Sequence, residues 1–261
     1  MHTTTAVALQ LLVLVLFSLP AHAAPETGDQ VLKAARDVLS PIRDKSMRVT
    51  MRVIDPAGGE RVRRLRGYEK HVDDARKVLW IFESPLELQG TGFLAWQNAS
   101  AADSLWVYFP GQRRVRRVPP SIRSERFQGS MFTYEDLVAV FFLDFHGDHV
   151  LEGTRPCDDD RRCFVVTTTL DQGVFAYDRL RTWVDATTLL PVRVEFFGDD
   201  LLKVMTVKEV ESVEGIPSIV RVDMESPSRD WVTRVELDEI DYNEDLRDNM
   251  FTIEYLSQTG K

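Results

Sequence analysis

The chain has 261 residues, of which 44% are hydrophobic, and it carries a formal net charge of −9. This hydrophobic content is ordinary for a folded globular protein and excludes bulk disorder. The acidic balance argues against binding to nucleic acid and against unspecific adhesion to anionic lipid surfaces.

The N-terminal segment has the pattern of a secretory signal peptide. Residues 6–19 are almost wholly apolar, Pro20 closes the run, and Ala21-His22-Ala23 is a small-x-small cleavage site. The run is shorter than the ~20 apolar residues that span a bilayer. We therefore predict a signal peptide over residues 1–23, with an uncleaved anchor as the alternative because no Lys or Arg precedes the run. No cysteine lies near the cleavage site, so we expect no lipid anchor.

Residues 24–261 are expected to form one domain, since no low-complexity linker or internal repeat divides them. Asp29 is a candidate cap for a first helix, whose apolar residues between Val31 and Leu39 share one face and which ends before Pro41. Residues 47–53 alternate between apolar and polar side chains, which indicates a strand exposed on one face. Residues 55–59 turn the chain into a second strand over residues 61–68. Further strands are expected at residues 77–82, 92–96, 104–109, 164–170, 180–185, 192–197, 202–210, 219–224 and 231–240.

The segment over residues 105–137 carries the most specific motif. A strand with alternating bulky residues ends at Pro110-Gly111, and four arginines follow within five positions before Pro119-Pro120 breaks the strand. Thr133 and Asp136 then form a Thr-x-x-Asp capping pattern. The helix that they begin is expected to contain Leu137, Val138, Val140, Phe141 and Phe142.

This order of residues resembles the core of a family of periplasmic outer-membrane lipoprotein-sorting-like proteins. These are relatives of the lipoprotein carrier LolA and are often associated with RND-type exporters. The matching residues are Trp106, Val107, Tyr108, Pro110, Arg113, Arg114, Arg116, Arg117, Phe127, Gly129, Ser130, Phe132, Thr133, Tyr134, Glu135, Asp136 and Leu137. The resemblance implies a periplasmic location, which agrees with the predicted signal peptide.

The many antiparallel strands and few helices indicate a mainly β (α+β) protein whose sheet must curl on itself. The resemblance implies a strongly curved antiparallel half-barrel, with short helices covering its concave apolar face. The N-terminal helix and the helix beginning at Thr133 are the expected covers, with an apolar cleft between them and the sheet.

Such a cleft would serve to shield an acyl chain from water. Each exposed methylene costs ~0.8 kcal/mol, so hiding a chain of ~14 carbons is worth up to ~10 kcal/mol. Aromatic residues and methionines suit variable apolar ligands, although each of them could equally be plain core. The candidate lining residues are Met51, Trp80, Phe82, Phe93, Trp96, Trp106, Tyr108, Phe141, Phe142, Phe196, Phe197 and Met205.

The arginine run Arg113, Arg114, Arg116 and Arg117 is a candidate site for lipid headgroups or for an acidic partner surface, because guanidinium pairs well with phosphate and carboxylate. Strand alternation would place Arg114 and Arg116 on one face. A second cluster lies over residues 61–66. The alternative is a solvated strand edge balanced by the acidic residues near the C-terminus. These are Glu236, Asp238, Glu239, Asp241, Glu244 and Asp245.

Cys157 and Cys163 are expected to form a structural disulfide across a hairpin, since a redox-active pair usually occupies a CxxC motif that the chain lacks. Asp144, His146, Asp148 and His149 could form a metal cluster, but a surface loop explains them better. No nucleophile elbow or phosphate-binding loop occurs. We therefore expect no enzyme activity, no cofactor and no metal.

Three functions remain open at this stage. The first is a monomeric periplasmic carrier that shields the acyl chains of a lipid or lipoprotein and transfers them between membranes, with an RND-type exporter as partner. The second is a sensory or regulatory module on the same fold, as in RseB-like proteins, which binds a lipidated ligand or a membrane-protein partner. The third is a periplasmic enzyme that uses the region of residues 146–149.

Overall fold

The computed structural model describes residues 25–38, 42–72, 75–98, 103–139, 143, 145–157, 161–171, 176–228 and 230–260. The predicted signal peptide lies outside these residues, as do Val140, Phe141, Phe142 and Asp144. Thirteen strands in the described ranges form one antiparallel sheet in the order β6-β5-β4-β3-β2-β1-β13-β12-β11-β10-β9-β8-β7.

The strands are β1 (Asp44–Ile54), β2 (Glu60–Val72), β3 (Ala75–Ser84), β4 (Gly92–Asn98), β5 (Ser104–Phe109), β6 (Arg114–Arg117), β7 (Gly147–Pro156), β8 (Arg162–Leu170), β9 (Arg179–Asp185), β10 (Pro191–Phe197), β11 (Leu201–Val213), β12 (Ile216–Glu225) and β13 (Val232–Tyr242). The helices are α1 (Gly28–Asp37), α2 (Pro120–Arg123), α3 (Asp136–Ala139) and α4 (Ile253–Leu256), with 3₁₀ turns η1 (Pro110–Gln112), η2 (Phe127–Gly129) and η4 (Asp248–Phe251).

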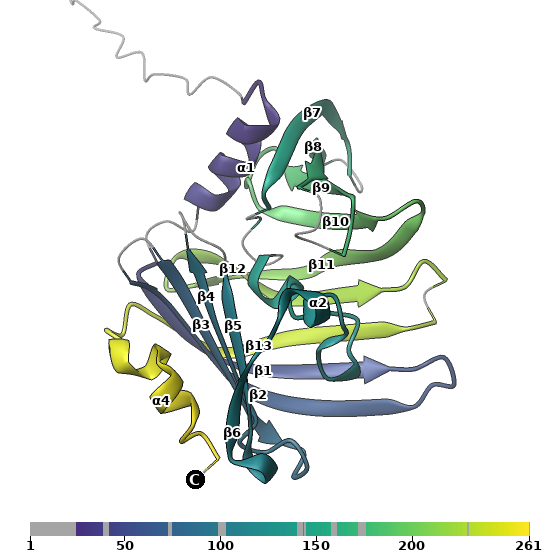
Figure 1. The fold of residues 1–261 in the computed structure, drawn as a ribbon. Helices are drawn as coiled ribbons and strands as arrows, with labels where there is room; N and C mark the ends of the chain where they lie inside the picture. The colour runs from purple at the N-terminus through teal and green to yellow at the C-terminus, as the bar shows by residue number, and fades with distance from the viewer. Residues whose placement is uncertain are drawn as a thin grey trace, which may run out of the picture.

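The sheet is open and strongly curved, with β6 and β7 as its two edge strands (Figure 1). Strands that follow one another in sequence pair with each other, except β6 and β7 at the two edges, and β1 also pairs with β13 in the middle of the sheet. This pairing joins the two halves of the chain into one continuous layer. The predicted mainly β half-barrel is confirmed.

The strands predicted from alternation are confirmed, because their apolar residues do face a core. In β1, Met47, Val49, Met51 and Val53 are buried, and the polar residues between them are only half-buried. The turn after β1 is closed by hydrogen bonds between Asp55 and Gly59 and between Gly58 and Asp55.

Two predictions about elements were wrong, and one helix was not predicted. The region of residues 147–149, expected as a surface loop, belongs to β7, an edge strand that carries polar residues on both faces and therefore gives no periodic signal. The cap of α1 is Thr27, whose side chain accepts a hydrogen bond from the backbone of Gln30, and Asp29 lies inside the first turn. The short helix α4 was not expected, since four residues are too few to show a helical period.

The concave face of the sheet carries the main core. Apolar side chains from strands in both halves of the sheet, such as Phe93 of β4 and Phe196 of β10, belong to one cluster with α1 and α3. Gly28 allows α1 to approach β7 closely, because a Cβ there would lie 2.6 Å from the carbonyl oxygen of His149. The predicted covering of this face by α1 and by the segment after Thr133 is confirmed.

The convex face carries a smaller core over β2 to β6. Here η4 and α4 pack Met250, Phe251 and Leu256 against Leu79 and Leu94 (Figure 1). None of the helices in the described part of the chain combines the length and the apolar character that crossing a membrane requires.

Cys157 and Cys163 form the predicted disulfide, at a Cα–Cα distance of 5.6 Å. The bond closes the turn between β7 and β8, where the backbone N–H of Cys157 also donates to the carbonyl of Arg161 over 3.0 Å. It therefore ties together the hairpin at one edge of the sheet.

We expect reduction of this disulfide to lower the free energy of unfolding by roughly 2 kcal/mol, because the closed loop is short and the loop-entropy gain is correspondingly small. Thiol titration of the denatured, unreduced protein should detect no free thiol. Urea unfolding with and without reductant measures the stability change, and the double variant C157S/C163S is the control that reductant should not affect. Two free thiols in the unreduced protein would contradict the pairing.

Candidate lipid-binding site

One segment of the chain crosses the concave face and fills it. We call residues 118–139 the strap. Its first residue, Val118, donates its backbone N–H to the carbonyl of Leu105 over 2.8 Å at the edge of β5, and farther along the N–H of Met131 reaches the hydroxyl of Thr233 on β13 over 2.9 Å. The strap contains α2, which lies in front of the sheet in Figure 1. It thus spans from one edge of the half-barrel to its middle.

Aromatic residues of the strap pack into the sheet. The ring of Phe127 lies 5.7 Å from the rings of both Phe82 and Phe93, measured between centroids. Phe132 is fully buried. These side chains occupy the space that an open cleft would leave free.

The strap leaves only a small void against the sheet. The volume of this cavity is about 10 Å³, which is at the lower limit for a single water molecule. Its lining residues are Val49, Met51, Leu65, Trp80, Phe127, Phe132, Leu137 and Val235. As described, this cavity is too small to hold an acyl chain.

The end of the strap is fastened by a buried polar cluster, which we call the latch and define as Thr133, Asp136, Tyr177 and Lys203. The ammonium of Lys203 contacts Asp136 and donates to the carbonyl of Met131 over 3.1 Å. The hydroxyl of Tyr177 donates to Asp136 over 3.1 Å. All four side chains are buried.

The predicted capping pattern supplies half of this latch. The backbone N–H of Thr133 donates to the Asp136 carboxylate over 2.6 Å, and the N–H of Asp136 donates to the Thr133 hydroxyl over 3.2 Å. Burial lowers the pKa of Lys203, while the negative charge of Asp136 raises it. Removing one partner of such a buried pair costs about 3–5 kcal/mol, so the latch holds the strap firmly.

Glu135 lies next to the latch in the sequence, and its buried carboxylate is not fully hydrogen-bonded. One of its carboxylate oxygens has no hydrogen-bond partner. Burial, together with the neighbouring charge of Asp136, raises the pKa of Glu135 to about 7, although Arg123 and Lys203 oppose the shift. Glu135 is therefore the group at the strap whose charge changes near neutral pH.

The predicted lining residues fall into three groups. Met51, Trp80, Phe82, Phe93, Phe196 and Met205 are buried in the core of the concave face. Trp96, Trp106 and Tyr108 pack on the convex face under α4, and the indole N–H of Trp96 donates to the carbonyl of Phe251 over 2.9 Å. Phe197 is half-buried with Arg179 over its ring. Phe141 and Phe142 lie outside the described residues.

Several cavity residues were not among the predicted ones. Phe127 and Phe132 were noticed as motif residues, and Val49 was part of the alternating pattern of β1. Sequence alternation assigns residues to a face but does not say which face is concave. Alternation alone therefore could not decide whether Trp106 or Val107 faces the concave side.

The arginine run lies at the edge of the sheet. Arg114 and Arg116 pair with Phe109 and Val107, so they share the concave side, as alternation predicted, while Arg117 pairs with Trp106 on the other side. All four arginines are exposed, and Arg113 begins the strand from a left-handed turn with φ 47°. Arg117 donates to the hydroxyl of Ser104 over 3.2 Å.

The acidic residues near the C-terminus have other partners. Glu239 pairs with Arg48 over 3.0 Å, and Glu236 pairs with Arg52 over 3.3 Å, both across the β1–β13 ladder. No ion pair between these acidic residues and the arginine run occurs in the described ranges. The exposure of the run agrees with a solvated strand edge, and its balance by the acidic residues stays a prediction.

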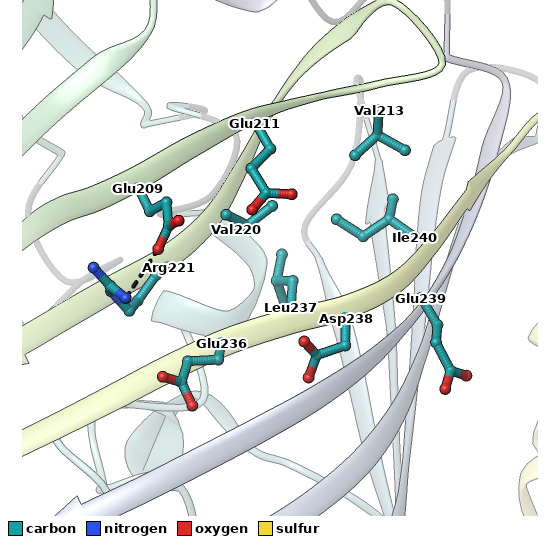
Figure 2. Close-up of a pocket in the computed structure, with 10 residues that line it drawn as sticks. All are labelled: Glu209, Glu211, Val213, Val220, Arg221, Glu236, Leu237, Asp238, Glu239 and Ile240. Atoms are coloured by element: carbon teal, nitrogen blue, oxygen red, sulfur yellow. Dashed lines mark ion pairs between the residues drawn. The ribbon is translucent and has the colours of Figure 1, made fainter.

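A separate acidic groove opens where β12 and β13 part. The pairing of these strands ends at Arg221 and Glu236, and beyond that point the two strands diverge (Figure 2). The groove has a volume of about 300 Å³, with apolar residues such as Leu237 and Ile240 between carboxylates at its rim. One of these carboxylates, Glu209, pairs with Arg221 over 2.9 Å. The acidic rim makes this groove unsuitable for an anionic lipid.

Metal-ligating side chains do not gather within the described part of the chain, where no group of three or more His, Cys, Asp or Glu could hold an ion. His149 instead shares a hydrogen bond of 2.9 Å with Thr168 on the neighbouring strand β8.

Comparison with known proteins supports a particular class of fold. Three solved structures align over almost all of their own length, which indicates a shared architecture rather than a shared fragment. A domain named for outer-membrane lipoprotein sorting, from Vibrio parahaemolyticus, has a TM-score of 0.78 at 23% identity and covers 88% of this chain and 100% of that chain. A LolA superfamily protein from Nitrosomonas europaea has a TM-score of 0.70 at 21% identity and covers 88% of this chain and 100% of that chain.

The sequence itself belongs to a defined family within this class. Residues 74–258 match the model of a family whose members are described as uncharacterized proteins, so the chain belongs to that family. A DUF1329 family protein from Desulfovibrio piger is 25% identical, with a TM-score of 0.77, and covers 86% of this chain and 98% of that chain. No curated protein matches the chain. The predicted resemblance to outer-membrane lipoprotein-sorting, LolA-like proteins is confirmed.

The raised pKa of Glu135 predicts a pH-dependent stability. Between its ordinary value of 4.5 and about 7, the folded protein holds a proton that the unfolded chain has released. The free energy of unfolding should therefore fall as pH rises through this window, by up to about 3 kcal/mol from this group. The variant E135Q cannot ionise and should lose this part of the pH dependence.

Chemical denaturation at pH 5 and at pH 8 measures the effect. The matched control is E125Q, which changes an exposed residue of the same strap and should keep the wild-type dependence. Equal pH dependence in E135Q and in the wild type would contradict the assignment.

Proposed function

We propose that this protein is a periplasmic carrier that takes the acyl chain of a lipid or lipoprotein onto its concave face and transfers it between membranes. We further propose that it acts without catalysis, as a monomer, together with an RND-type inner-membrane exporter. The observation that carries the proposal is the cover of the concave face. This face is mainly apolar, yet α1 and the strap cover it instead of a second sheet.

A strap of this kind suits the exchange of one apolar partner for another. When an acyl chain replaces Phe127 and Phe132 on the sheet, buried apolar area is exchanged and not lost, so the protein core stays shielded from water. The free energy of loading is then set mainly by the latch and by the exposure of the strap. Each methylene that leaves water contributes ~0.8 kcal/mol toward offsetting those costs.

The fold of the relatives supports the same function. The similar structures include one named for outer-membrane lipoprotein sorting and one assigned to the LolA superfamily. The predicted signal peptide would place the mature chain where such sorting happens. The exporter partner rests on the family resemblance of the arginine run, whose exposed guanidiniums at the sheet edge suit an acidic surface or a headgroup.

Loosening the latch should speed up loading. We expect K203M to take up a fluorescent fatty acid several-fold faster than the wild type, because the change leaves Asp136 without its cation and weakens the hold on the strap. Stopped-flow fluorescence measures the uptake rate, and circular dichroism checks that the variant is folded. The matched control is K208M, since Lys208 is an exposed lysine of the same strand.

Native mass spectrometry of the protein from a periplasmic extract provides an independent test. A bound acylated species would support the carrier. Apo protein that also takes up no added fatty acid or lipopeptide would contradict it and favour a regulatory module of the same fold. Uptake by the wild type at the same rate as by K203M would show that the strap does not limit entry.

Reversing the charge of the arginine run should impair transfer without affecting stability. The double variant R114E/R116E changes two exposed side chains that have no ion pair within the described residues, so its melting temperature should stay within about 2 °C of the wild type. Transfer of a fluorescent lipid from donor to acceptor vesicles should slow several-fold. The control R155E/R179E reverses two exposed arginines of β7 and β9. Unchanged transfer would remove the arginine run from the proposed function.

A further inference from the structure

Arg63 is a charged residue on the concave, apolar face. It lies in β2 directly opposite Met51 of β1, and paired residues of neighbouring strands point to the same side. Met51 and Leu65, two residues farther along β2, both line the cavity under the strap. Arg63 therefore lies on the same face of the sheet as these two lining residues and next to both of them, and it is only 8% exposed.

The charge of Arg63 is balanced only weakly, by Glu87, with which it forms no ion pair. Its Nη1 has no hydrogen-bond partner, and no ion pair within the described ranges reaches it. Burial lowers the pKa of Arg63, and the like charge of Arg61 lowers it further, while Glu87 raises it. An uncompensated buried charge is strongly unfavourable, so an arginine held in this way needs a reason.

Glu69, on the same strand, is a buried charge that is balanced by ion pairs within the fold. Glu69 is about equally buried, at 7% exposed, and it contacts Arg76 over 2.8 Å and Lys45 over 3.3 Å. Arg63 has no equivalent pair. Within the described residues, Arg63 is thus a buried cation without an ion-pair partner.

A second donor faces the same space. Trp80 lines the cavity, and its buried indole N–H has no hydrogen-bond partner. The strap passes the guanidinium at Gly129, where φ is +71° and a Cβ would lie 4.0 Å from Nη2, so no side chain of the strap at this position contacts Arg63. Two donors without hydrogen-bond partners, one in the cavity lining and one beside it, thus lie on the face whose described lining residues are otherwise apolar.

We propose that Arg63, assisted by Trp80, binds the anionic head of the ligand, a carboxylate or a phosphate, whose acyl chain lies on the concave face. This inference rests on the proposed carrier function and adds the ligand class, an acyl chain with a negatively charged head. A planar guanidinium can donate two parallel hydrogen bonds to either anion, and such a bond is strong away from water. The ligand would supply the negative charge that would pair with Arg63.

The test compares charged and neutral ligands of equal chain length. One arm titrates the wild type with a fluorescent fatty acid and with its methyl ester, and a second arm uses lysophosphatidic acid and monoacylglycerol as competitors. We expect the wild type to bind the anionic member of at least one pair about tenfold more tightly. The arm that shows the larger ratio identifies carboxylate or phosphate as the head.

Three variants isolate the role of Arg63. R63M should lose the preference for the anion while still binding the ester, and R63K should retain part of the preference because it keeps the charge. The matched control is R64M, which changes the adjacent, exposed arginine on the opposite face and should behave as the wild type. The empty R63M protein should also melt at a higher temperature, since an uncompensated buried charge is replaced by an apolar side chain.

The outcomes separate this inference from the function on which it rests. Equal binding of acid and ester by the wild type would overturn the head site and leave the carrier function standing. Binding of neither ligand would overturn both. A lower melting temperature of R63M would show that Arg63 supports the fold, and that would also overturn the proposed head site.

Discussion

The buried pair of Lys203 and Asp136 is the interaction on which the state of the half-barrel depends. An open, curved sheet exposes an apolar concave face, and each Å² of apolar surface in contact with water costs about 25 cal/mol of free energy. The chain covers this face with its own strap, and the latch fixes the end of the strap to β11. Because both charges are buried, the pair is stable only while the strap is in place, so that strap and latch are held or released together.

This arrangement would separate the two tasks of the proposed carrier. The sheet, joined in its middle by the pairing of β1 with β13, gives a rigid frame that needs no ligand. The strap fills the frame when no ligand is bound and leaves a cavity of about 10 Å³. In the proposed function, a ligand would compete with Phe127 and Phe132 for the same surface, which would favour molecules with a long apolar part.

Charge is distributed in keeping with such a ligand. The protein is acidic overall, yet the arginine run lies at the β6 edge and Arg63 lies inside the concave face. Carboxylates near the C-terminus pair with arginines of β1 or line the groove between β12 and β13. An anionic amphiphile would thus find cations at the edge and in the interior of the half-barrel, while the acidic groove repels it.

The sequence by itself determined the strand series, the disulfide, the capping pair Thr133–Asp136 and the class of fold, because these depend on local periodicity and on short motifs. It did not determine which face of each strand is concave, so Trp106 and Phe93 were equally good candidates for the ligand site. It also missed β7, whose polar residues give no period, and the latch, whose Lys203 lies 67 residues from Asp136. Only the tertiary structure brings such distant residues together, because curvature and strap placement follow from packing of the whole sheet. Only the tertiary structure shows that Arg63 is buried without an ion-pair partner among the described residues.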